Sequence, residues 1–276
     1  MHKRRTACGA LILGLLTANA IHAQTASLWP KFALSAGAFD SSTKDEIGVD
    51  GEIGAAGDAV DVATQIGLPD SKTALSAEIE WGFADRHSLE LRYGSLKREG
   101  SRRLIDEVEI GGRVFPVGAD GTVSLTTTSL EAGYTYWLVR RERFGFGGTI
   151  GVVELSVDAA ASATARIPGS SATITESASA STDLPVPMVG LAVKGQPWDR
   201  VVLYARGRFL PSVKFGRYDG EAGSFSLGTH VYLTRWFALG ASYDGTYYRA
   251  DVDDPGWRGS VDLETQGFRL YLRAAF

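Results

Sequence analysis

Apolar residues recur at every second position through most of this chain, and no other feature constrains its fold as strongly. In residues 268–276 (FRLYLRAAF), one parity carries Phe, Leu, Leu, Ala and Phe, while the other carries Arg, Tyr and Arg. Successive side chains of a β-strand point to opposite faces, whereas a helix would repeat its apolar residues three and four positions apart. The sequence therefore predicts an all-β protein.

Ten segments show this alternation, and we expect ten strands, with barrels of eight or twelve strands as alternatives. The alternation is least regular in 143–157 and 184–195, and its change of phase near Gly151 predicts a β-bulge there. The expected ranges are 31–39, 73–83, 87–96, 125–138, 143–157, 184–195, 200–214, 222–234, 236–250 and 260–276.

The connections between these segments alternate in length. Those at 84–86, 139–142, 196–199 and Arg235 are short, whereas 40–72, 97–124 and 158–183 are long. Short periplasmic turns and longer extracellular loops are typical of outer-membrane barrels. The last long segment is rich in Ala, Ser and Thr. It predicts either a flexible loop or strands that continue above the membrane to a turn at Pro168-Gly169.

Alternation alone fits a soluble sandwich as well as a membrane barrel, and three further features separate them. The polar face carries charges in mid-strand, and the chain ends on Phe276 directly after its last strand. Because unpaired backbone groups are costly in lipid, a sheet that crosses a membrane must close on itself. We therefore expect a closed antiparallel transmembrane β-barrel. Aromatic residues also gather near strand ends, as in interfacial girdles: Trp81, Phe83, Tyr134, Tyr136, Phe144, Trp236, Phe237 and Tyr247.

The first residues predict export. Basic residues at 2–5 (HKRR) precede the apolar run ACGALILGLLT, which is too short to cross a bilayer as a helix. We expect a Sec-type signal peptide at 1–23, cleaved after Ala23, and a barrel domain at 24–276. The only cysteine, Cys8, would leave with the signal. Loss of the three Lys and Arg charges would move the formal net charge from −4 to −7, which disfavours nucleic-acid binding.

The segment Phe268-Arg269-Leu270-Tyr271-Leu272-Arg273-Ala274-Ala275-Phe276 resembles the C-terminal strand of bacterial outer-membrane β-barrel proteins. In that class the last strand alternates, ends in Phe and is read by the barrel-assembly machinery. The resemblance implies an outer-membrane location and an assembly partner during biogenesis. The alternating pattern of this class extends over the whole mature chain, but its specific motif occurs only in this strand. The resemblance indicates no specific functional family. The implied assembly signal comprises Phe268, Leu270, Leu272 and Phe276.

The charges on the polar face predict a network inside the barrel. Carboxylates lie mostly on early strands and arginines on late ones, and barrel closure would bring the two sets together. A barrel of about ten strands encloses little more than side chains, and buried charges require partners. We expect these residues to fill the lumen, with a narrow channel for ions or small solutes as the alternative. The expected network comprises Glu78, Glu80, Glu90, Arg92, Glu131, Arg206, Arg208, Arg269 and Arg273.

No catalytic, metal or cofactor site is indicated. Only His87 and His230 belong to the expected mature chain, and neither forms part of a clear Ser-His-Asp arrangement. The acidic segments 40–72 and 251–256 carry oxygen ligands of the kind calcium prefers, but lack the spacing of a calcium loop. We expect no catalytic, metal or cofactor-binding residue. An outer-membrane enzyme acting on lipid or peptide is a second alternative.

Residues 97–103 (KREGSRR) place basic side chains at the expected outer rim. Lys97, Arg98, Arg102 and Arg103 could pair with lipopolysaccharide phosphates, or could form an ordinary charged loop. We expect a small outer-membrane barrel with a filled polar lumen that acts as a structural or surface-interaction protein. Its expected partners are outer-membrane lipid and lipopolysaccharide.

Overall fold

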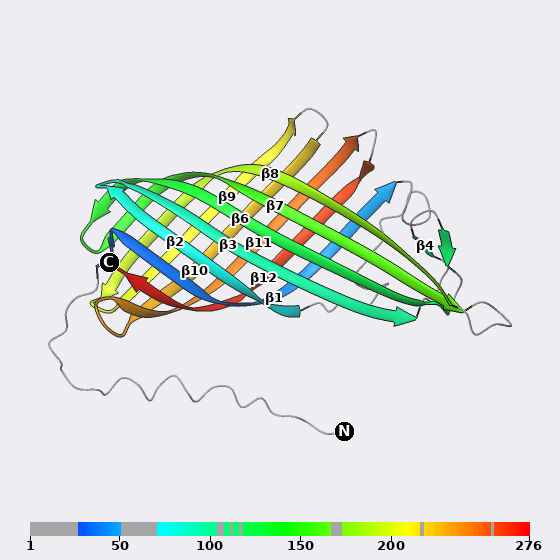
Figure 1. Ribbon diagram of the computed structural model, residues 1–276. Helices are drawn as coiled ribbons and strands as arrows, with labels where there is room; N and C mark the ends of the chain where they lie inside the picture. The colour runs from blue at the N-terminus through cyan, green and yellow to red at the C-terminus, as the bar shows by residue number, and fades with distance from the viewer. Residues whose placement is uncertain are drawn as a thin grey trace, which may run out of the picture.

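The computed structural model describes residues 27–50, 71–103, 108–110, 113–115, 118–166, 173–215, 218–254 and 257–276. In this part of the chain, ten strands form one closed antiparallel barrel, and a separate hairpin lies beyond one end (Figure 1). The barrel strands are β1 (Phe32–Asp50), β2 (Ser71–Ala84), β3 (His87–Arg103), β6 (Asp120–Arg141), β7 (Phe144–Arg166), β8 (Thr173–Trp198), β9 (Val201–Phe215), β10 (Tyr218–Tyr232), β11 (Phe237–Asp254) and β12 (Trp257–Ala275). The hairpin pairs β4 (Val108–Ile110) with β5 (Arg113–Phe115). Among the described residues, no helix is long and apolar enough to cross a membrane.

The predictions of an all-β fold and a closed ten-stranded barrel are confirmed. The strands extend beyond their expected ranges, because parts of 40–72, 97–124 and 158–183 continue in strand conformation. For the last of these segments, the expectation of strands that continue above the membrane is correct. The expected turn at Pro168-Gly169 and the expected signal peptide at 1–23 lie outside the described residues.

The strands turn their apolar faces outward. On β12, Phe268, Leu270 and Leu272 are 66–68% exposed, whereas Arg269 and Arg273 are 3% exposed. A soluble barrel would bury the apolar face, so this inversion fits a wall that contacts lipid. Exposed aromatic residues also surround the periplasmic-turn end, as in an interfacial girdle: Trp81, Phe83, Tyr136, Phe144, Trp198, Trp236, Phe237 and Phe276.

The expected bulge at Gly151 is wrong. Gly151 pairs in unbroken register with both neighbouring strands, and the bulge in this part of the wall lies between Trp137 and Val139. The alternation was misleading because Val153 points into the barrel, where it is 3% exposed. The alternation assigns every apolar side chain to the lipid face. An apolar residue that faces the lumen therefore looks like a shift of the alternation by one position.

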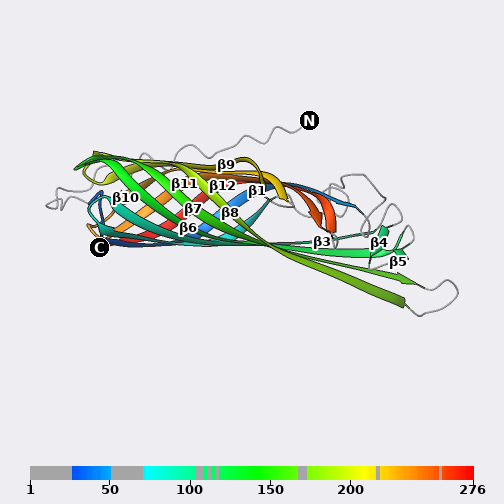
Figure 2. The same cartoon turned by 90° about the horizontal axis from the view of Figure 1, so that it is seen from above.

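The extracellular half of the wall separates into two lobes. β3, β6, β7 and β8 continue as one sheet, while β9 to β12 and β1 continue as another. The green ends of β7 and β8 consequently diverge from the yellow-to-red strands (Figures 1 and 2). Pairing between β8 and β9 stops at Val189↔Phe209, although β8 runs from Thr173 and β9 runs on to Phe215.

The interior has three layers. Nearest the periplasmic turns is the periplasmic cap, formed by Leu28 and Trp29 against the barrel wall. The charge layer lies in the middle, and the apolar layer lies farthest from these turns. The apolar layer consists of Val153, Met188 and Ala222 with Val186, Leu210 and Tyr248 packed against them.

Tyr271 shows how closely the lumen is filled. It pairs with Gly37 on β1 and with Gly240 on β11. A Cβ atom at Gly240 would lie 2.1 Å from Cε2 of the Tyr271 ring. The Tyr271 hydroxyl lies 2.9 Å from that of Tyr204. Large side chains therefore occupy the space that glycines leave on neighbouring strands, as in a close-packed interior.

Candidate functional site

The candidate site is the charge layer in the middle of the lumen. Alternation directs every second side chain inward, so the members come from seven strands spread over the barrel. The layer comprises Glu78, Glu80, Glu90, Glu131, Asp244, Arg92, Lys194, Arg206, Arg208, Arg269 and Arg273, each ion-paired with another member. The structure brings together all nine residues that the alternation assigned to the lumen.

Glu78 connects β2 to β3 and to the last strand. Its Oε2 accepts hydrogen bonds from Arg92 Nε at 3.0 Å and from Arg269 Nη1 at 3.2 Å. β1 lies between β2 and β12, so the contact with Arg269 spans an intervening strand. Barrel closure is therefore what brings these two side chains together.

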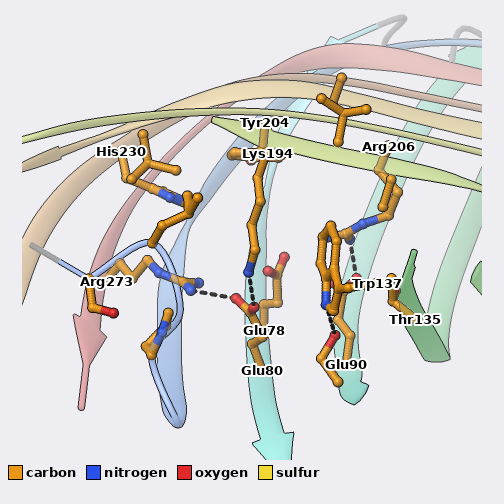
Figure 3. Close-up of a pocket in the computed structure, with 18 of the residues that line it drawn as sticks. Glu78, Glu80, Glu90, Thr135, Trp137, Lys194, Tyr204, Arg206, His230 and Arg273 are labelled. Carbon is orange, nitrogen blue, oxygen red and sulfur yellow. Dashed lines mark hydrogen bonds and ion pairs between the residues drawn. The ribbon is translucent and has the colours of Figure 1, made fainter. Parts of the chain in front are cut away.

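Glu80 has two cationic partners. Its carboxylate lies 2.5 Å from Arg273 Nη2 and 3.2 Å from Lys194 Nζ (Figure 3). Arg273 Nη1 also donates to the hydroxyl of Ser35 on the intervening β1, at 3.4 Å. Glu80 thus links β2 to β12 on one side and to β8 across the lumen.

Arg206 and Arg208 of β9 form a second group of pairs. Arg206 donates to Glu90, while Arg208 pairs with Glu131 and lies 3.6 Å from Glu90. The Arg208 side chain is 1% exposed, and its Nε donates to Thr149 at 3.2 Å. A guanidinium this far from water depends on its partners, because removing one member of a buried pair costs about 3–5 kcal/mol.

Sequence reasoning missed two members of the layer. Asp244 lies 3.1 Å from Arg269 Nε and accepts a hydrogen bond from Ser242 at 2.8 Å. Lys194 lies on β8, where the alternation is irregular. Asp244 could have been recognised from the sequence, because it lies two positions after Ser242 and so on the same face of β11. The signal for Lys194 was obscured because Met188, at the same parity, is also lumen-facing and is apolar.

Trp29 covers the charge layer from the periplasmic side. Its indole Nε1 donates to the carbonyl oxygen of Arg141 at 2.8 Å, and its ring meets that of Trp137 edge to face at 5.0 Å. Lys194 Nζ lies 4.2 Å from the centre of the Trp29 ring, which is a cation–π distance. Leu28 is 3% exposed and completes the cap. Sequence reasoning missed the cap because these residues precede the first alternating segment.

A small cavity remains between the cap and the charge layer. Its volume is about 50 Å³, and its lining includes Glu80, Lys194, His230 and Arg273 (Figure 3). A cavity needs about 10–15 Å³ to hold a water, so this space can hold water molecules. The surrounding groups can hydrate and pair one another, but the cavity is too small for an organic solute.

Neither histidine of the expected mature chain lies at the outer rim. His230 faces the lumen near the periplasmic turns, with its ring stacked on Tyr204 at 4.9 Å between centroids. His87 begins β3 at a periplasmic turn, and its Nδ1 lies 2.6 Å from the Tyr134 hydroxyl. Among the described side chains, no group of three or more His, Cys, Asp or Glu is arranged to hold a metal ion.

The basic residues at the outer end of β3 do not share one environment. Arg98 is 1% exposed, whereas Lys97, Arg102 and Arg103 are exposed. Lys97 Nζ lies 2.6 Å from Glu99, and its hydrogen bond holds the pKa of this exposed carboxyl below its usual value. A contact between this segment and an external phosphate would therefore involve the three exposed residues and exclude Arg98.

Arg249 ties three strands of the second lobe together. Its Nε lies 2.9 Å from Asp262 on β12, and its Nη1 lies 2.8 Å from Glu221 on β10. The hydrogen bonds that Arg249 donates, above all to Asp262 and then to Glu221, raise the pKa of its guanidinium. These ion pairs hold the outer ends of β10, β11 and β12 together and do not form a pocket.

The barrel resembles solved structures of outer-membrane proteins. It superposes on the outer membrane protease OmpT from Escherichia coli with a TM-score of 0.57 and 9% identity, covering 89% of this chain and 96% of the other. The translocator domain of NalP from Neisseria meningitidis matches with a TM-score of 0.44 and 15% identity, covering 89% and 87%. OprG from Pseudomonas aeruginosa matches with a TM-score of 0.36 and 13% identity, covering 92% and 98%. No family model and no curated protein sequence matches the chain.

The chain has the fold of a bacterial outer-membrane β-barrel. The apolar outer face, the exposed aromatic residues and the closed sheet are those of a barrel whose wall contacts lipid. OmpT is a protease, but at 9% identity the likeness extends to the fold alone. A shared fold does not imply a shared function, so the function must be argued from the site.

Proposed function

We propose that this barrel is a non-conducting structural or surface-interaction protein of the outer membrane. The observation that carries the proposal is the closed lumen. The side chains of Arg208, Arg269 and Arg273 are only 1–4% exposed, and all three lie in ion pairs. A solute crossing the barrel would have to separate these pairs and displace the periplasmic cap.

The composition of the charge layer supports this role. It contains six cationic groups and five carboxylates, and each has an oppositely charged neighbour. Charges that are satisfied by one another give a passing ion few free ligands. The layer therefore acts as a brace that holds the strands together, while the lobes above it provide the surface for interaction.

Conductance in planar bilayers tests the proposal. The protein, purified from outer membranes, should give no steady current steps in concentrated KCl. The cap variant Trp29→Ala should remain closed, because the charge layer lies above the cap. Replacing Arg206 and Arg208 together with Ala should create brief openings if folding is retained. Large, steady steps in the unmodified protein would overturn the proposal and support a narrow channel.

The proposal includes the absence of an enzymatic role. Both candidate histidines lie at the periplasmic end, and His230 is held between Tyr204 and Tyr271. The purified barrel should therefore release neither fatty acid from lipopolysaccharide nor fragments from unstructured peptides. Reproducible turnover, lost on heat unfolding, would contradict this part of the proposal.

We further propose that Lys97, Arg102 and Arg103 contact lipopolysaccharide phosphates in the outer leaflet. Basic side chains on an exposed strand can pair with phosphate oxygens without entering the lumen. Changing all three to Gln should weaken binding to lipopolysaccharide, but not to its dephosphorylated form. Arg143→Gln, at a periplasmic turn, provides the control. Unchanged binding by the triple variant would remove this contact from the proposal.

A further inference from the structure

The barrel wall is interrupted between β8 and β9. The last pair in this ladder is Val189↔Phe209. Continuing the same register would place Pro187 directly opposite Pro211. Two facing residues of an antiparallel ladder exchange two N–H···O bonds when they form a hydrogen-bonded pair. Proline has no N–H, so this pair can form neither bond, and the sequence itself ends the ladder here.

Pro185 and Pro187 are suited to a strand edge that contacts lipid. The β7–β8 ladder continues without a break through Glu154↔Pro185 and Val152↔Pro187. A strand accommodates proline where its nitrogen faces the unpaired side, so both nitrogens face the gap. An N–H in this place would find no partner in lipid. The prolines therefore remove two donors that an open edge would otherwise leave unsatisfied.

The gap begins in the outer part of the membrane. From Trp198 at the periplasmic turn to Val189, β8 has about the ten residues that a strand needs to cross the hydrocarbon core. Phe209 is 51% exposed and Val152 is 42% exposed, as lipid-facing residues are, while the next outward position on β7 is Glu154. The lower edge of the gap therefore lies at the outer boundary of the hydrocarbon core, next to the acyl chains of the outer leaflet.

An apolar groove of about 670 Å³ leads along the outer face to this gap. Its floor follows the register from Ile150 through Val189 to Phe209. Met188 and Leu210 line the groove and also belong to the apolar layer inside the barrel. The outer groove and the apolar layer therefore meet at the gap. Among the described residues that line the groove, none is charged.

We propose that the gap between β8 and β9 is a lateral portal that admits the hydrocarbon chain of an outer-leaflet amphiphile to the apolar layer. The lining selects hydrocarbon, because it offers no charged group to a phosphate or a sugar. The outer leaflet is the source, because acyl chains already cover Phe209 and Val189 in the membrane. The charge layer closes the route below, so the chain docks in the barrel and does not cross it. This role goes beyond a scaffold.

A fluorophore on single-cysteine variants tests the portal. Cys8 is the only cysteine in the sequence, so in a Cys8→Ser background an introduced cysteine is a unique attachment point. Met188→Cys reports on the apolar layer, and Val189→Cys, 49% exposed, reports on the lipid face. Ser242→Cys is the matched control, because Ser242 is 4% exposed in the lumen and β11 is paired on both sides.

The labelled proteins are compared in phosphatidylcholine vesicles that carry a nitroxide on the acyl chain near the headgroup. Quenching at position 188 should approach that at 189 and exceed that at 242 several-fold. Position 188 behaving like 242 would overturn the portal. Quenching at 188 by aqueous iodide, but not by the lipid nitroxide, would also overturn it by showing a water-filled gap. Leu210→Cys repeats the test from β9, and heat-modifiable migration checks that each variant is folded.

Discussion

Removing Glu80 should destabilise the barrel more than removing Arg273, although the two residues form one ion pair. Glu80 lies 2.5 Å from Arg273 and 3.2 Å from Lys194, so its loss deprives two cations of a partner. Loss of Arg273 instead leaves Glu80 paired with Lys194. The charge layer has one more cation than carboxylates, so removing Glu80 raises this excess to two and removing Arg273 cancels it.

The magnitude follows from burial. The side chains of Arg273, Lys194 and Glu80 are 4%, 11% and 17% exposed. Breaking a buried pair by removing one partner costs about 3–5 kcal/mol, and we expect Glu80→Ala to lie at the upper end. Arg273→Ala should cost about 1.5–3 kcal/mol less, which is the contribution of one hydrogen bond to a charged group. The double variant should show a coupling energy of about 1–3 kcal/mol.

Urea unfolding in phosphatidylcholine vesicles, followed by tryptophan fluorescence, measures these differences. Glu80→Gln, which keeps the side-chain volume, provides a second measurement if the alanine variant does not fold. The control is the Arg143–Asp199 pair at the periplasmic turns, which has a 2.6 Å separation but side chains 54% and 51% exposed. Its coupling should be only about 0.2–1 kcal/mol. Equal losses for the Glu80 and Arg273 variants, or additive effects in the double variant, would refute a buried, mutually dependent layer.

Three further changes test the wall. Leu270→Arg places a charge on the lipid face of β12 and should lower the free energy of unfolding by about 2–4 kcal/mol. Leu233→Arg, at the periplasmic end, should lower it by only about 0–1 kcal/mol. Equal losses in a bilayer-refolding assay would contradict the depths assigned to these two residues. Gly240→Ala should slow folding, because its Cβ would meet the Tyr271 ring, while Gly207→Ala has no atom within 4 Å and should fold normally; stopped-flow refolding compares them. Deleting Phe276 should lower the amount of heat-modifiable barrel at the cell surface, because its carbonyl and amide close the terminal ladder. Normal surface levels would show that the last residue is dispensable.

The alternation predicted most of the fold because a lipid-facing wall imposes it directly. An outward residue such as Leu270 meets hydrocarbon, and an inward residue such as Arg269 meets charge, so local sequence carries the face assignment. The extent of the strands was less predictable. Above the membrane both faces can be polar, so the Ala-, Ser- and Thr-rich ends of β7 and β8 fitted a flexible loop as well as continuing strands.

Nine of the eleven members of the charge layer were predicted, but their individual partners were not. Which cation meets Glu80 depends on barrel diameter and strand stagger, and these bring Lys194 across the lumen from a strand far away in the sheet. The apolar layer escaped prediction for a different reason. Val153 and Met188 look like lipid-facing residues in the sequence, and only the register shows that they face inward. The facing of Pro187 and Pro211 likewise becomes visible only once β8 and β9 are aligned.

The ion pairs that join the two ends of the chain also determine how the barrel can fold. Arg269 and Glu78 are 191 positions apart, and Arg273 and Glu80 are 193 apart. Contacts of such long sequence separation form late and make folding slow. Before β12 arrives, the early carboxylates would lack these partners, so an incomplete sheet in the bilayer gains little stability. We therefore expect the strands to insert into the bilayer together. The pairing of β12 would be the step that commits the whole chain to the inserted barrel.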